Sequence, residues 1–317
     1  MEWITRIQEI IKKRGKNSEA NQDDLQSRPE EKKLQIEAYR IETVEELSKL
    51  PTPPNIFEDP NWMGNNEENI ENFRMFWQKQ GRSREILEKL LQNVHFISKL
   101  RYIQSLIKLI ASIDQHCQKP IILSTPPTGI SPLEIKHTID NLDLLKEYQN
   151  IKLWWKMSRK LSIDEIINFF ELNPTGTFVG IDDAGYSGSK MSLSTTSDHL
   201  NYNWPIEYAL VAASKQAIEN YFRTPRVRGV HLCYRILALN EIFEKEELKE
   251  LASYYNATAE DIGWLMTTFR HNTVADYFFR GLLKDRNYPG TPDYQNNIGI
   301  IELYRLRDSR KQEFGLK

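Results

Sequence analysis

Short apolar runs alternate with helical patterns through the C-terminal two thirds of the chain. Four segments are rich in apolar residues or alternate apolar with polar positions, as strands do. They are residues 121–123, 151–157, 177–181 and 228–237. Helical signals lie between them at 131–148 and 162–171, where Ser131 and Ser162 are suitable N-cap residues. Strands that alternate with helices predict an α/β domain with a parallel sheet.

The rest of the hydrophobic pattern is mostly helical. Residues 34–50 predict a strand followed by a helix, and a proline-rich stretch then interrupts regular structure. Helical spacing also predicts helices within 3–14, 67–112, 204–222, 243–270 and 272–284, with a last strand at 298–303. We therefore expect a mostly helical N-terminal region, residues 1–92, with a polar linker and the proline-rich break. An α/β domain is expected over residues 93–317.

Composition narrows the class of partner. The 317 residues include 42 basic and 44 acidic side chains, so the formal net charge of −2 gives no global field for nucleic acid, which is not an expected partner. No run of about 18 apolar residues exists to span a membrane, so no membrane partner is expected. The two cysteines, Cys117 and Cys233, form no CxxC motif. This cysteine usage indicates a reducing compartment and predicts a cytoplasmic protein.

The most informative stretch follows the strand expected at 177–181. Residues 178–190 read FVGIDDAGYSGSK, so an apolar strand ends in the adjacent carboxylates of Asp182 and Asp183. In an open α/β sheet, ligands bind outside the carboxyl ends of the strands. Two carboxylates there can accept hydrogen bonds from sugar hydroxyls and help to hold a hydrated Mg²⁺. The loop behind them is suited to a phosphate through its small, flexible and hydrogen-bonding residues. Its candidates are Gly185, Tyr186, Ser187, Gly188, Ser189 and Lys190.

This stretch resembles the motif with which type I phosphoribosyltransferases bind phosphoribosyl pyrophosphate (PRPP). In that motif an apolar strand leads into an acidic pair, three variable residues, and then Thr or Ser followed by Gly. Asp182 and Asp183 match the pair, and Ser187 and Gly188 match the end of the motif. The resemblance implies a phosphoribosyltransferase-like α/β fold with a parallel sheet. It also implies that the acidic pair contacts the ribose hydroxyls and water-bound Mg²⁺, while the loop holds the 5-phosphate.

The resemblance extends weakly to both sides of the motif. The first expected strand and the loop behind it lie where the family keeps its pyrophosphate-binding loop, which implies pyrophosphate contacts for Thr128 and Gly129. Residues 267–279 faintly resemble a segment of viral and bacterial phosphoribosyltransferase-like proteins. That likeness implies that His271 and Asp276 line the pocket. The alternative is that both are solvated or capping side chains beside core aromatic residues.

Several functions are compatible with the resemblance. The leading expectation is transfer of a ribose 5-phosphate group from PRPP to an unidentified acceptor. Its oxocarbenium-like transition state needs charge stabilisation more than a strong base. The alternative is a protein that senses PRPP or a nucleotide and acts on a protein partner through its N-terminal helices, or a purely structural interaction protein. An ordinary Asp-rich turn or an actin-like phosphate loop at 183–185 would also account for the motif.

Other familiar chemistries lack their motifs. The chain contains no HExxH, GxSxG, GxxxxGK[ST] or GxGxxG element, so zinc-peptidase, serine-hydrolase, Walker-type and Rossmann interpretations have no support. His116 and Cys117 are neighbours in sequence, but adjacent helical residues point in different directions. A structural zinc site is therefore not expected from the sequence.

Overall fold

The structure is a computed structural model of the 317-residue chain. It describes residues 36–55, 71, 74–75, 77–79, 81–97, 99–125, 135–136, 138–140, 142–154, 168, 171–185, 205–254, 258–263 and 268–270. No helix within those ranges is both long and apolar enough to cross a membrane.

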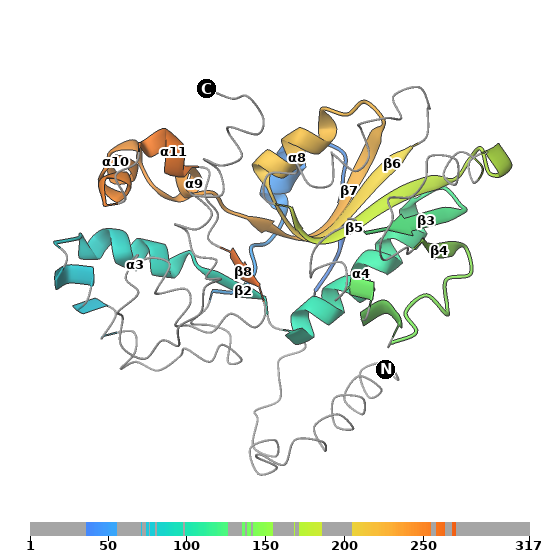
Figure 1. The fold of residues 1–317 in the computed structure, drawn as a ribbon, viewed down its shortest axis with the longest axis horizontal. Coiled ribbons are helices and arrows are strands. Elements are labelled where there is room, and N and C mark those ends of the chain that lie inside the picture. Colours follow the sequence, from blue (N-terminus) through green and yellow to red (C-terminus); the bar gives the residue numbers. More distant parts are fainter. Residues whose placement is uncertain are drawn as a thin grey trace, which may run out of the picture.

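A six-stranded sheet forms the centre of the described chain (Figure 1). Its strands are β1 (Tyr39–Ile41), β3 (Ile121–Ser124), β4 (Ile151–Trp154), β5 (Thr177–Gly185), β6 (Ile206–Ser214) and β7 (Val227–Ile236). Their order across the sheet is β1-β7-β6-β5-β3-β4, and every neighbouring pair is parallel except β1 with β7. The expected α/β class with a parallel sheet is confirmed, as are strands at the four segments named above.

Helices cover both faces of this sheet. The long helix α4 (Lys99–His116) packs on one face, where its residues Leu106, Leu109 and Ile113 share a core with β3, β5 and β6. Helix α8 (Lys215–Phe222) covers the opposite face, and its Ile218 and Tyr221 belong to a second core. Figure 1 shows the resulting three layers, with α8 and α4 on either side of the strands. Burial on both faces explains why the central strands are continuously apolar rather than alternating.

The order of the parallel strands contains a reversal. Starting from β4, the five parallel strands lie in the sequence order second, first, third, fourth and fifth. After β3 the chain moves outward to β4, whereas after β5 it continues in the other direction to β6 and β7. The crossover after β3 packs Ile135 and Ile139 into the α4-side core, while the crossover after β6 is α8 on the other face. The point of reversal therefore lies between β3 and β5.

The helix expected over 204–222 is wrong in its first half. Residues Ile206–Ser214 form β6, which is buried at every position, and only Lys215–Phe222 is helical. The run Tyr-Ala-Leu-Val-Ala-Ala has no polar side, and it is buried because α4 and α8 cover the two faces of its strand. Ser214 ends the strand and caps the helix, since its hydroxyl accepts a hydrogen bond from the Ala217 amide at 3.1 Å.

The helical pattern over 67–112 is also interrupted. Helix α3 (Arg84–Gln92) and α4 are present, but β2 (His95–Ile97) lies between them and pairs in parallel with β8 (Thr268–Arg270). A short strand that pairs with a segment far along the chain leaves no local periodicity to find. Part of the segment expected as helix at 243–270 is likewise strand β8, and the helix expected to reach 148 gives way to turns over 142–147.

A smaller group of helices lies beyond the carboxyl ends of the central strands (Figure 1). It comprises α3, α9 (Leu239–Ile242), α10 (Lys245–Ser253) and α11 (Ala259–Gly263). Helices α3 and α10 are joined by an ion pair of 2.6 Å between Lys89 and Glu247. Helix α9 follows β7 directly, so it lies beside the edge of the sheet at which ligands of open α/β proteins bind.

The N-terminal part of the described chain joins the same sheet. Strand β1 pairs with β7, the 3-10 helix η2 (Glu45–Lys49) follows it, and the Arg235 amide donates to the Pro51 carbonyl at 2.9 Å. The strand and helix expected at 34–50 are thus present. Residues on the N-terminal side of the boundary expected at 92 contribute the antiparallel edge of the α/β sheet.

Candidate functional site

The acidic pair lies near the carboxyl end of the central strand β5. Pairing of β5 with β3 ends at Gly180 opposite Ser124, whereas its pairing with β6 continues to Gly185 opposite Ala213. Asp182 and Asp183 therefore lie beyond the last residue of β3, at the reversal of strand order. Both are buried, with exposed fractions of 2% and 8%. The strand also extends further than the five residues expected from the sequence.

Asp182 lies toward helix α8, and backbone amides orient both carboxylates. Asp182 is paired with Leu210, whose side chain packs in the α8-side core. The Asp183 amide donates to Asp182 Oδ1 at 2.9 Å, and the Ala184 amide donates to Asp183 Oδ1 at 2.6 Å. Each carboxylate is thus oriented by the backbone of the residue that follows it.

Helix α8 supplies the surroundings of Asp182. Tyr221 of α8 stacks on Tyr208 of β6 with ring centroids 4.3 Å apart. Burial raises the pKa of Tyr221, and the nearby Tyr208 and the negative charge of Asp182 raise it further. A Cβ atom on Gly185 would lie 3.0 Å from the Tyr221 hydroxyl and 3.2 Å from Ala217 Cβ, so glycine permits this close approach of strand and helix.

The structure brings together only part of the sequence-predicted site. Asp182, Asp183 and Gly185 share the end of one strand. The other candidates lie outside the described residues: Thr128, Gly129, Tyr186, Ser187, Gly188, Ser189, Lys190, His271 and Asp276. Their roles in phosphate, pyrophosphate or pocket contacts remain predictions, as does the Mg²⁺ expected at the acidic pair.

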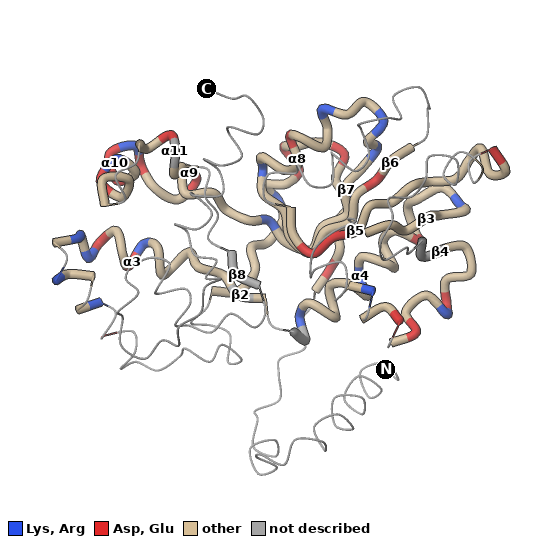
Figure 2. The backbone as a smooth tube through the Cα atoms, in the orientation of Figure 1, with Lys and Arg blue, Asp and Glu red and all other residues tan. Residues whose placement is uncertain are grey.

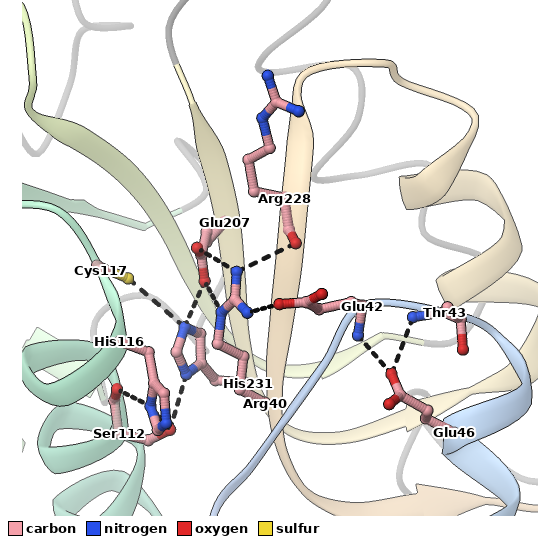
Figure 3. Close-up of polar contacts among 10 residues, drawn as sticks. All are labelled: Arg40, Glu42, Thr43, Glu46, Ser112, His116, Cys117, Glu207, Arg228 and His231. Atoms are coloured by element: carbon pink, nitrogen blue, oxygen red, sulfur yellow. Dashed lines mark hydrogen bonds and ion pairs between the residues drawn. The ribbon is translucent and has the colours of Figure 1, made fainter.

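A second polar cluster lies at the other end of β6 (Figure 3). Arg40 of β1 holds Glu207 with two hydrogen bonds, from Nε to Oε2 at 3.0 Å and from Nη2 to Oε1 at 2.9 Å. The same guanidinium donates to the Arg228 carbonyl and to the Glu42 carboxylate. This forked contact joins the edge strand to β6 across β7.

His231 extends the cluster into the interior. Its Nε2 atom lies 2.7 Å from Glu207 Oε2, and its Nδ1 atom lies 2.8 Å from the hydroxyl of Ser112 in α4. Cys117, just after α4, places Sγ 3.6 Å from the same Nε2 atom. His231 has no exposed surface, so the imidazole is shielded from water. Residues from β1, β6, β7 and α4 therefore meet around one imidazole.

The charges of this cluster are compensated inside the protein. Burial alone would raise the pKa of Glu207, but hydrogen bonds from His231 and Arg40 outweigh it and lower the pKa to about 2. Burial lowers the pKa of His231, against the effect of Glu207, so the imidazole is neutral and its Nε2–H donates to the carboxylate. Burial and the charge of Glu207 raise the pKa of Cys117. These effects favour the protonated thiol.

Gly229 makes room for the forked contact. A Cβ atom at this position would lie 2.8 Å from Arg40 Nε and 2.9 Å from its Cζ and Nη2 atoms. The guanidinium cannot swing aside without leaving Glu207, because two of its nitrogens are bound there. Glycine is thus required by the close approach of a side chain rather than by an unusual backbone conformation.

Sequence reasoning missed the second cluster. Its members are spread over residues 40, 112, 117, 207 and 231, and Glu207 fell within a segment expected as helix. One available signal was the pair Glu207 and His231, charged or titratable residues in otherwise apolar runs. Buried polar side chains in such runs need partners.

Comparisons with known proteins found a solved structure with a low structural similarity to this chain. No protein-family model matches the chain, and no curated protein matches it. Among solved structures, the chain is similar to the orotate phosphoribosyltransferase from Aeropyrum pernix, with 12% sequence identity and a TM-score of 0.28. That match covers 51% of this chain and 93% of the other. The class that the structure itself defines is an α/β protein with a mostly parallel sheet.

Proposed function

We propose that the carboxyl end of β5 binds a phosphorylated ribose of the PRPP class, as in phosphoribosyltransferase-like proteins. The observation that carries the proposal is the position of Asp182 and Asp183 at the reversal of strand order, beyond the end of β3. At such a point the crossovers leave the sheet on opposite sides, and ligands of open α/β proteins bind in the crevice between them.

The chemistry of the pair suits this ligand. Carboxylates accept hydrogen bonds from the vicinal hydroxyls of a ribose, and they favour oxygen-bound Mg²⁺ in the company of a pyrophosphate. The two adjacent carboxylates at the strand end would contact the sugar hydroxyls and the hydrated ion. The loop 186–190 would then receive the 5-phosphate, as the resemblance implies.

A thermal-shift experiment tests binding directly. PRPP with Mg²⁺ should raise the melting temperature of the full chain, because a ligand that binds only the folded state stabilises it. The double variant Asp182→Asn with Asp183→Asn should lose the shift. Glu246→Gln is the matched control, since this exposed carboxylate of α10 pairs only with nearby Lys249 among the contacts described, and its shift should equal that of the wild type. A shift that survives in the double variant refutes the site.

Pyrophosphate release distinguishes an enzyme from a sensor. If the protein transfers the ribose 5-phosphate group, adding candidate nucleobases to the protein with PRPP and Mg²⁺ should release pyrophosphate above the rate of the double variant. A protein that shows the thermal shift without release is a PRPP- or nucleotide-binding module. A chain that shows neither is a protein with another function.

A further inference from the structure

Three side chains with metal-binding atoms converge between α4 and the sheet. They are Cys117, Glu207 and His231, and one ligand atom from each lies within 4.8 Å of the other two (Figure 3). All three are buried, and they lie just after α4, near the start of β6 and in the middle of β7. Glu207 is the second residue of β6, whereas Asp182 of the acidic pair lies opposite Leu210 in the middle of that strand.

We propose that Cys117, Glu207 and His231 supply three protein ligands to a site for a thiophilic divalent cation of the Zn²⁺ class, with a water as the fourth ligand. In a tetrahedral zinc site the ligand atoms are about 3.3–3.6 Å apart, given metal–ligand distances of about 2.0–2.3 Å. The Cys117 Sγ to His231 Nε2 distance of 3.6 Å already matches this spacing. The 2.7 Å contact between His231 Nε2 and Glu207 Oε2 must widen by about half an ångström, as the cation replaces the hydrogen between them.

The donor set selects the kind of cation. Thiolate and imidazole ligands favour zinc and similar transition metals, whereas Mg²⁺ and Ca²⁺ prefer oxygen ligands alone. The proposed site is therefore distinct in chemistry from any Mg²⁺ held by Asp182 and Asp183. The charges also balance, because the thiolate of Cys117 and the carboxylate of Glu207 offset the two positive charges of the ion. Arg40 retains Glu42 as a second anionic partner.

Neighbouring residues already hold the ligands in the required orientation. Metal-bound histidines commonly donate their second ring N–H to a protein oxygen, and His231 Nδ1 faces Ser112 Oγ at 2.8 Å. Arg40 fixes both oxygens of Glu207 and leaves the lone pair of Oε2 that faces His231 for the cation. On binding, the imidazole proton moves from Nε2 to Nδ1, the Nδ1–H group donates a hydrogen bond to Ser112 Oγ, and the thiol proton leaves to solvent.

Cobalt provides a spectroscopic test on the full chain. Reduced protein freed of metal with a chelator is titrated with Co²⁺, which occupies zinc sites and gives a thiolate charge-transfer band when a cysteine is bound. The expected result is a band that saturates at a stoichiometry of one, disappears on adding Zn²⁺ and persists in excess Mg²⁺. Wild-type protein without this band at saturating Co²⁺ overturns the proposal.

Single substitutions show which residues bind the cobalt ion that produces the charge-transfer band. Cys117→Ser should abolish it, and Cys233→Ser is the matched control, because Cys233 is a second buried thiol that contacts the Ser105 carbonyl rather than this cluster. Circular dichroism checks that Cys117→Ser folds. If it does not fold, His231→Gln tests the same site from β7, and this variant is expected to weaken Co²⁺ binding at least tenfold. A band that survives Cys117→Ser, or one lost in Cys233→Ser alone, contradicts the assignment.

Discussion

Two groups of buried acidic residues occupy the same sheet, and they differ in what surrounds them. Glu207, near the start of β6, is held by Arg40 and His231, so that a cation and an imidazole from two other strands compensate its charge. Asp182 and Asp183, near the end of β5, receive hydrogen bonds from the amides of their own successors and lie at the strand reversal. Figure 2 shows acidic positions on both strands at these different ends.

The difference teaches how to interpret a buried carboxylate. Burial alone does not indicate function, since both groups are almost fully shielded. A carboxylate bound in a fork by Arg across three strands holds elements together. Under the proposed function, a pair at the carboxyl edge of an α/β sheet contacts a ligand. The comparison predicts that changes at the first group alter stability, whereas changes at the second alter ligand binding.

The largest expected effect follows from removing Arg40. Arg40→Met should lower the free energy of unfolding by about 3–5 kcal/mol, because Glu207 would keep a buried charge without its guanidinium partner. Urea unfolding measures the change. Arg74→Met is the matched control, since Arg74 makes a similar forked contact with Glu88 at the surface, and its loss should be below about 1 kcal/mol. Equal losses would show that Arg40 is not the more important partner.

A smaller loss is expected from Gly229→Ala. The added Cβ displaces the Arg40 guanidinium from Glu207, which should cost about 1–3 kcal/mol by the same unfolding measurement. The same substitution made in Arg40→Met protein should cost much less, because the side chain that it displaces is already gone. If the two costs are equal, the close approach of Arg40 is not the reason for this glycine.

Acid should remove the contribution of Glu207. Since the folded-state pKa of about 2 lies below the ordinary value of 4.5, its stabilisation is present above about pH 4.5 and is lost as the pH falls toward 2. We expect a loss of about 2–3 kcal/mol across this window in chelator-treated protein. Glu207→Gln should show a shallower decline over the same range. Parallel curves for the two proteins would contradict the assignment.

The smallest effect on stability is expected at the acidic pair. Asp182→Asn and Asp183→Asn keep a side-chain oxygen for the amides of residues 183 and 184, so each should change the free energy of unfolding by less than about 1 kcal/mol. Chemical denaturation of each single variant measures this. A loss of about 3 kcal/mol or more would place the pair with Glu207 among the residues that hold the sheet together.

Local pattern was sufficient for most of the sheet. The apolar runs that became β3, β5 and β7 are bounded by proline, glycine or polar turns, and each is found as a strand close to its expected position. The carboxylates at 182 and 183 were also apparent from the sequence because they directly follow such a run. Strands buried on both faces leave this local trace, since most side chains along them are apolar.

Long-range contacts decided the remainder. The segment 206–214 is a strand because neighbouring strands and two helices enclose it, and β2 and β8 exist only through pairing across more than half of the described chain. The order of the strands, which places Asp182 and Asp183 at the reversal, is likewise set by tertiary packing.

The sequence by itself determined the α/β class, most strands and the acidic motif, because each depends on neighbours in the chain. Only the tertiary structure decided that Arg40, Ser112, Cys117, Glu207 and His231 share one buried cluster. Burial forces polar groups to find partners wherever the fold supplies them, and those partners need not be near in sequence.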